Sequence, residues 1–303
     1  MIFFLLRGII FIMRLKYIFY LVLILLLVGN SFGCANKSVK AELLTSMAQL
    51  DRVFVPAFIF TELGRQRESE IALEMLKGSW LLFYDRFAKM QMRYGLNIVD
   101  KFWQEDFENI NRAVLTAETY VKEGKFGEAN SELNDVRVIL KSLRHRHGLD
   151  YFLDSMTEFD LAVGEMTALL QGRNRLTDRE MDQLRQKFGR VQKAWLEADR
   201  VEIDPEAFSF KPEKVKAIKD RVKAEEKILA TFAVALSSKQ MDRIAQTSTT
   251  LRPNYYLLYK AFGDFQPIFD KIVQERKQKE KEEAEAKKAS PEADKKGSVS
   301  DDK

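Results

Sequence analysis

The chain has 303 residues, of which 46% are hydrophobic and 31% are charged, with 49 basic residues against 45 acidic ones. At about 150 residues per domain this length suggests two domains, and the hydrophobic content excludes a chain that is disordered throughout. A single cysteine excludes a disulfide framework and any zinc or iron–sulfur site with several cysteine ligands. Two histidines leave little room for a histidine-rich metal centre.

Residues 1–33 have the pattern of a bacterial lipoprotein signal peptide. They contain three basic residues and no acidic one, and residues 17–28 form an unbroken apolar run of 12 residues. Such a run fits the ~7–15 residues of a signal peptide and is shorter than the ~20 residues of a membrane span. Translation from Met13 would supply a complete signal too, so both Met1 and Met13 are candidate starts.

The only cysteine, Cys34, follows this segment directly, after the small residue Gly33. The arrangement resembles the lipidation site of bacterial lipoproteins, in which the cysteine is acylated and becomes the first residue of the mature chain. Ser31 stands where leucine is usual, and Phe32 is bulky for this motif. An ordinary secretory signal and an uncleaved anchor over residues 1–33 are the alternatives. We expect lipidation at Cys34 and attachment to a membrane through it.

The residue after Cys34 is Ala35. By resemblance to lipoprotein sorting, a residue other than aspartate at this place favours delivery to the outer membrane, facing the periplasm. Removal of residues 1–33 lowers the basic count from 49 to 46 against 45 acidic residues, so the mature net charge is +1. A nucleic-acid binder needs a net basic surface, and this composition gives no support for one.

The first half of the body, residues 34–150, is predicted to form one helical unit. Apolar side chains recur there at steps of three and four residues, which is the spacing of amphipathic helices. The expected helices cover residues 38–63, 67–94, 100–123 and 126–147. Pro56 has no backbone N–H, so we expect it to kink or interrupt the first of them.

The second half, residues 151–270, is predicted to form a second unit, so that the all-α fold consists of two tandem up-down bundles of roughly four helices. Thr177 and Glu180 have the spacing of a capping box, and Pro212 suits the first position of a helix. The expected helices cover residues 150–171, a stretch starting at Thr177, and residues 212–237, 238–253 and 254–283. Trp80 and Trp195 fall 115 residues apart in a weak internal repeat, for which duplication and chance alignment of amphipathic helices are equally open.

Residues 271–303 form a charged tail with 10 basic and 9 acidic residues and almost no apolar side chain. Pairs such as Glu283 and Lys287 can support a helix in its first part through contacts between adjacent turns. After Pro291 we expect disorder. The tail is interpreted as a solvated segment or a spacer.

The two histidines, His145 and His147, stand among basic residues at a predicted helix end. Their spacing of two residues points the imidazoles to different faces, which disfavours a shared metal ion, and basic side chains there can satisfy terminal carbonyls. No metal ligands are therefore assigned. The haem-attachment motif and the Glu-x-x-His pairs of di-iron bundles are both missing from the sequence.

Carboxylates occur on an otherwise apolar predicted helix, at Glu158, Asp160 and Glu165. Glu158 and Glu165 are seven residues apart and share a helix face, so a hydrolytic carboxylate pair is one interpretation and a solvated helix face is the other. The aromatic group at residues 255–265 fits a ligand pocket or, with more support from its spacing, a helix core. No catalytic residue and no cofactor are assigned.

Several segments resemble an uncharacterised class of exported helical proteins of bacteria; they are residues 51–61, Trp80, residues 124–129, 144–154 and 262–265. Some members of that class carry histidine in the fourth and fifth helices, where Asn130 and Asp160 stand here, so the resemblance implies no ligand site and no activity. The turn at residues 124–129 also resembles a tetratricopeptide hairpin, but no 34-residue repeat follows it.

We expect a lipid-anchored protein of the bacterial cell envelope that acts as a non-enzymatic binding or scaffold module for an envelope protein partner. The alternative from another class is a haem- or metal-carrying helical bundle in envelope redox chemistry or metal handling. The sequence does not identify the partner.

Overall fold

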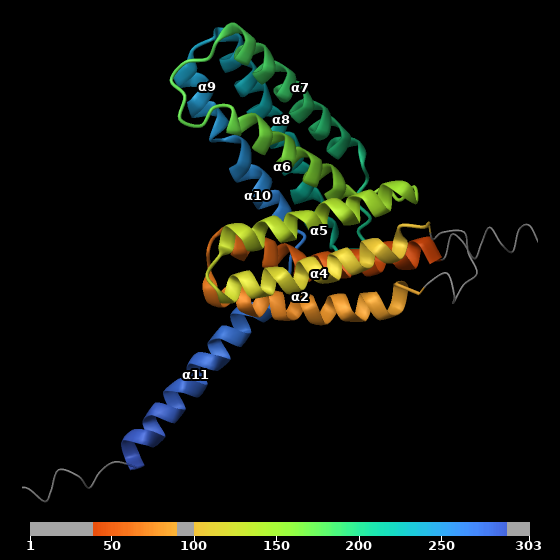
Figure 1. Ribbon diagram of the computed structural model, residues 1–303, viewed down its shortest axis with the longest axis vertical. Coiled ribbons are helices and arrows are strands. Elements are labelled where there is room, and N and C mark those ends of the chain that lie inside the picture. The colour runs from red at the N-terminus through yellow and green to blue at the C-terminus, as the bar shows by residue number, and fades with distance from the viewer. Residues whose placement is uncertain (1–38, 90–99, 290–303) are drawn as a thin grey trace, which may run out of the picture.

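The computed structural model describes residues 39–89 and 100–289, and every regular element in these two ranges is an α-helix (Figure 1). The all-α expectation is therefore confirmed for the described part of the chain. The expected signal peptide, Cys34 and the last 14 residues, 290–303, lie outside the described residues. So does the expected helix end at residues 90–94.

Four helices form a first group, which lies in the lower half of Figure 1. They are the N-terminal helix Val39–Glu62, α2 (Gln66–Phe87), α4 (Trp103–Lys122) and α5 (Phe126–Arg146). Helix α4 packs against both α2 and α5. The N-terminal helix is tied to α5 by a hydrogen bond that the Asn130 side chain donates to the Phe58 carbonyl, 3.4 Å. It is tied to α2 by the ion pair of Glu42 with Arg86, 2.7 Å.

The N-terminal helix is a core element. Among the described residues, this helix has the length and apolar composition that could cross a membrane. However, 67% of its most apolar 18-residue segment is buried inside the body. Leu43, Phe54 and Phe58 are each at most 1% exposed. A buried helix of a compact protein passes the same length test, because burial and lipid select the same side chains.

A second group of helices follows along the chain and lies in the upper half of Figure 1. It contains α6 (Phe152–Ala168), α7 (Asp178–Arg200), α8 (Pro212–Ser238), α9 (Met241–Ser248) and α10 (Leu251–Lys260). Contacts run from α6 to α7, α7 to α8, α8 to α10 and α10 back to α6, so these four helices close a ring. The capping box at Thr177 and Glu180 is confirmed, as is Pro212 in the first turn of a helix.

The expectation of one helix over residues 254–283 was wrong, because the chain breaks between α10 and α11 (Gln266–Ala289). The N-terminal helix runs through Pro56 without ending, and Pro56 leaves the carbonyl of Arg52 without its usual donor. The backbone N–H of Asp264 donates to that carbonyl at 2.8 Å, and the Arg52 guanidinium binds the Asp264 carboxylate at 2.9 Å. The backbone N–H of Asp264, in the break after α10, thus supplies the donor that the N-terminal helix lacks at Pro56.

Gly263 makes this close approach possible. A Cβ at this position would lie 2.8 Å from the Phe265 ring and 3.0 Å from side-chain atoms of Pro56 and Val55. Such distances are shorter than van der Waals contact, so a larger residue would push the break away from the N-terminal helix.

Helix α11 leaves the body as an isolated projection (Figure 1). Its base is held to the start of α2 by the pair Lys271–Glu74, 2.6 Å, and by Arg67, which binds Glu275. The predicted helical first part of the charged tail is confirmed as far as Ala289. The start of the N-terminal helix lies at the other end of α2, where Arg86 binds Glu42.

Buried side chains of both groups form one continuous hydrophobic core. Helices α5 and α6 meet where the two groups join, and α10 packs on α6 from the second group. The second helix of each group carries a buried tryptophan, Trp80 in α2 and Trp195 in α7, at 1% and 2% exposure. The division between residues 150 and 151 into separate units stays a prediction.

Candidate functional site

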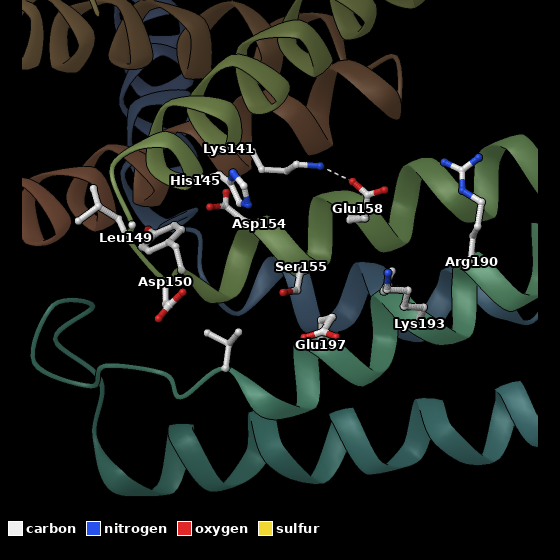
Figure 2. A pocket seen from close by; sticks show the side chains of 14 residues that line it. Lys141, His145, Leu149, Asp150, Asp154, Ser155, Glu158, Arg190, Lys193 and Glu197 are labelled. Atoms are coloured by element: carbon white, nitrogen blue, oxygen red, sulfur yellow. Dashed lines mark hydrogen bonds and ion pairs between the residues drawn. The ribbon is translucent and has the colours of Figure 1, made fainter. Parts of the chain in front are cut away.

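A groove of about 670 Å³ lies where the two helix groups meet (Figure 2). Lys141 and His145 of α5 form one side, and Arg190, Lys193 and Glu197 of α7 form the other. The floor comes from α6 and the turn before it, with Asp154, Ser155 and Glu158 exposed to the groove. The volume is in the range of small-molecule and peptide sites, and the lining is more polar than such sites usually are.

Most charges around the groove already have partners. Lys141 binds Glu158 across the gap between α5 and α6 (Figure 2). Arg190 binds Glu165 at 2.7 Å, and Lys187 binds the same carboxylate at 3.0 Å. Within the described residues, His145 and Lys193 line the groove with no hydrogen-bond or ion-pair partner. These two side chains are therefore the cationic groups that an incoming ligand could bind without first breaking an ion pair, His145 only when protonated.

Behind the groove floor lies a buried polar cluster that joins the N-terminal helix to the start of α6. Tyr151, which lines the groove, donates a hydrogen bond to Asp51 at 2.5 Å. Arg144 binds Asp154 through two nitrogens, at 2.9 Å for Nε and 2.5 Å for Nη2, and stacks 4.4 Å above the Tyr151 ring. Burial raises the pKa of Asp51 to about 6, against the lowering effects of Arg144 and Tyr151. The cluster ties the groove floor to α5 and to the N-terminal helix.

A second buried cluster, centred on Arg137 of α5, crosses the junction on another side of α6. The guanidinium binds Asp160 at 3.1 Å and the Tyr255 hydroxyl of α10 at 3.1 Å. It also lies between two rings, 4.5 Å from the centre of Phe58 and 5.2 Å from that of Tyr259. Arg137 is 3% exposed, so this ion pair has excluded nearly all water. The arrangement fixes α5, α6, α10 and the N-terminal helix relative to one another.

The histidines point to different surroundings, as their spacing indicates. His145 faces the groove, whereas the edge of the His147 ring packs on Trp103, with ring centres 5.3 Å apart. Burial lowers the pKa of His147, although Asp100 lies 3.8 Å from its Nε2. The described residues contain no group of three or more His, Cys, Asp or Glu side chains placed to hold a metal ion.

The carboxylates of α6 do not form a hydrolytic pair. Of the two candidates, Glu158 lines the groove and Glu165 does not, and both are engaged by basic side chains, at 42% and 45% side-chain exposure. Basic side chains lower the pKa of Glu165, with Lys187 as the largest cause, so it stays ionised at neutral pH. Asp160, the third carboxylate noted on this helix, is the buried partner of Arg137.

The aromatic group at the end of the second half is core, as its spacing favours. Tyr255, Tyr259 and Phe262 are each at most 1% exposed. Asn130 stands at one of the places where histidine occurs in the resembled class, and its side-chain amide donates a hydrogen bond to the backbone carbonyl of Phe58.

The buried charges have a signal in the sequence, which is their position on apolar helix stripes. Arg137 and Arg144 follow Leu133 at steps of four and eleven residues, which places both on the apolar stripe of α5. Asp51 lies in the same way between Met47 and Phe54. A charged residue at a core position predicts a buried partner, because an isolated buried charge is strongly unfavourable.

Comparisons with family models, with curated proteins and with solved structures give no match to this chain.

Proposed function

We propose that this chain is a lipid-anchored protein of the bacterial cell envelope that acts as a non-enzymatic binding or scaffold module. The observation that carries the proposal is the position of Cys34. It is the only cysteine, it follows a 12-residue apolar run, and it stands five residues before Val39, where the described body begins. A thiol at that place serves acylation, and several acyl chains anchor a protein stably at about 0.8 kcal/mol per buried CH₂.

The arrangement of the body supports a scaffold. The N-terminal helix starts beside the end of α2, where Glu42 binds Arg86, and α11 starts beside the beginning of α2, where Glu74 binds Lys271. Helix α2 has 22 residues, which is about 33 Å at 1.5 Å per residue. A lipid attached at Cys34 would thus hold one end of the first helix group at the membrane and leave α11 at the other end.

The groove between α5 and α7 is the proposed contact site for an envelope protein partner. Its floor is tied to α5 by the Arg144–Asp154 pair and to the N-terminal helix by the Tyr151–Asp51 hydrogen bond. The sites on its walls with no internal partner, His145 and Lys193, suit an acidic segment of that partner. The tandem arrangement of two helical bundles, 34–150 and 151–270, belongs to the same proposal.

Fractionation of cells that express Cys34→Ser tests the anchor. We expect the variant to carry no acyl chains and to keep the full-length signal, which can itself hold the chain at the inner membrane, whereas the control Ala35→Ser, which leaves the thiol in place, is processed and acylated like the native chain. Ala35→Asp should move the protein from the outer to the inner membrane. A Cys34→Ser chain of the same processed size as the native protein would refute the proposal.

Cross-linking in the native envelope tests the groove. Lys193→Glu should weaken capture of the partner, because it places a negative charge opposite an acidic segment. Lys216→Glu on α8, where the side chain is 78% exposed, makes the same charge change far from the groove and should leave capture unchanged. Equal capture by both variants would exclude the groove as the contact site.

A further inference from the structure

At one end of the first helix group, the ends of four helices come together. The start of the N-terminal helix meets the end of α5 through Lys40, whose ammonium donates to the His147 carbonyl at 3.0 Å. The end of α2 meets the start of α4 through the Trp103 indole, which donates to the Phe87 carbonyl at 3.0 Å. We name this end, with the adjoining turn of α2, the Cys34-side end.

The length of chain before Val39 limits how far this end can be from the acylation point. Cys34 and Val39 are five residues apart, and a fully extended chain covers at most about 3.6 Å per residue, or about 18 Å in total. That reach is about half the length of α2, which has 22 residues. Acyl chains on Cys34 would therefore hold Val39, at the start of the N-terminal helix, within about 18 Å of the acylated Cys34.

Apolar side chains are exposed at this end. Phe102, directly before α4, is 43% exposed, and Leu82, on the outer side of α2 within two turns of its end, is 76% exposed. Leu81 beside it is 53% exposed. Single exposed apolar residues are ordinary on a protein surface, but these lie on the one part of the body that the chain length places next to lipid.

The groups around Phe102 suit the interface between water and lipid. Lys101 lies 4.7 Å above its ring, and Arg146 lies 5.6 Å from the ring centre. Long basic side chains can keep their charge at the headgroups while their stems and a neighbouring aromatic ring enter the boundary. Arg146 binds both Asp100 and Asp106, so one positive charge is shared by two carboxylates.

Charge alone does not supply the contact, because Glu105 in the first turn of α4 is exposed among these basic residues. The contact with lipid depends on two features together, which are the short chain between Cys34 and Val39 and the exposed apolar side chains.

We propose that the Cys34-side end rests on the lipid surface that holds the acylated Cys34, with Phe102 and Leu82 at the headgroup boundary. This inference rests on the proposed lipid anchor. It fixes the orientation of the protein, since the second helix group and α11 then face away from the membrane. Its partner is a lipid surface, and other proteins at this end are an outcome of the test.

Lipidated full-length protein in phosphatidylcholine vesicles with brominated acyl chains tests the orientation. Separate variants Phe102→Trp and Leu82→Trp place a fluorophore at the end, and Val234→Trp, at a 62% exposed position of α8, is the matched control. Native Trp80, Trp103 and Trp195 are buried, so the native protein gives the background to subtract. Circular dichroism checks that each variant keeps its helices.

We expect bromolipid to quench the added tryptophan at residue 102 or 82 at least twice as strongly as the one at residue 234. Equal quenching at all three positions in protein whose mass shows the acyl chains would overturn the orientation and leave the anchor standing. Protein without acyl chains would contradict the anchor and the inference together. Quenching that disappears when other envelope proteins are added would show that the end serves a protein contact and not lipid.

Discussion

Glu225 of α8 is a buried carboxyl group with no basic partner. Its residue is 0% exposed, its Oε2 accepts a hydrogen bond from the Asn254 side chain at 2.7 Å, and its Oε1 has no partner in the described structure. Burial raises its pKa from 4.5 to about 7, against the small lowering effect of Asn254. The neighbouring Arg221 contributes only its backbone carbonyl, which accepts from the same amide.

The sign of the pH dependence follows from this shift. The folded protein holds the Glu225 proton up to about pH 7, while the unfolded chain releases it near its ordinary pKa of 4.5. The folded state therefore binds more protons in that window, and the free energy of unfolding falls as the pH rises from about 4.5 to 7. At about 1.4 kcal/mol per pKa unit, the loss approaches about 3.5 kcal/mol above pH 7.

Glu225→Gln removes this dependence, because glutamine keeps an acceptor for Asn254 and carries no charge. Urea unfolding between pH 4 and 8 should show the variant close to the native protein at pH 4 and more stable by up to about 3.5 kcal/mol at pH 8. Asp51, whose pKa is raised to about 6, titrates in both proteins and cancels in the difference. Glu226→Gln, an exposed neighbour, is the control and should follow the native curve. A difference between Glu225→Gln and native protein that is constant with pH would refute the reasoning.

Three further changes test the packing. Arg137→Met leaves Asp160 buried without its close partner and should lower the free energy of unfolding by about 3–5 kcal/mol. The double variant Arg137→Met with Asp160→Leu should lose less stability than the sum of the two single variants. Additive losses in urea unfolding would show that the pair is not coupled. Gly263→Ala should lower the free energy of unfolding by about 1–3 kcal/mol, because its Cβ would lie 2.8 Å from the Phe265 ring. The control Gly78→Ala in α2, whose Cβ would meet no atom within 4 Å, should stabilise the protein by up to about 1 kcal/mol. A stabilised Gly263→Ala would contradict the described break. Thr177→Ala removes the cap of α7 and should cost about 1 kcal/mol in thermal or urea unfolding, and an unchanged midpoint would show that the cap is not formed.

Local signals in the sequence predicted most helices. The capping box at Thr177, Pro212 in the first turn of α8, and the turn glycines Gly124 and Gly148, which have φ of +73° and +60°, each act within a few residues. Such features are readable because the group and its partner are neighbours along the chain.

The break between α10 and α11 also has a local signal, because Gly263 follows the end of α10 and Pro267 stands in the first turn of α11. What local signals do not show is the carbonyl of Arg52, more than 200 residues earlier, that Pro56 leaves open for Asp264. The pairing of Arg137 with Asp160 is of the same kind. Their places on apolar stripes indicate burial, but only the packing of α5 on α6 decides which charges meet. The groove likewise depends on the angle between two helix groups.

The mass of the mature N-terminal peptide, taken from protein purified from the membranes of its own host, tests the central claim most directly. The account predicts a peptide that begins at Cys34 and carries the mass of attached acyl chains, together with loss of acylation and of signal cleavage in Cys34→Ser. A peptide that retains residues of the apolar run, or one that begins after residue 34 with no acyl mass, would contradict it.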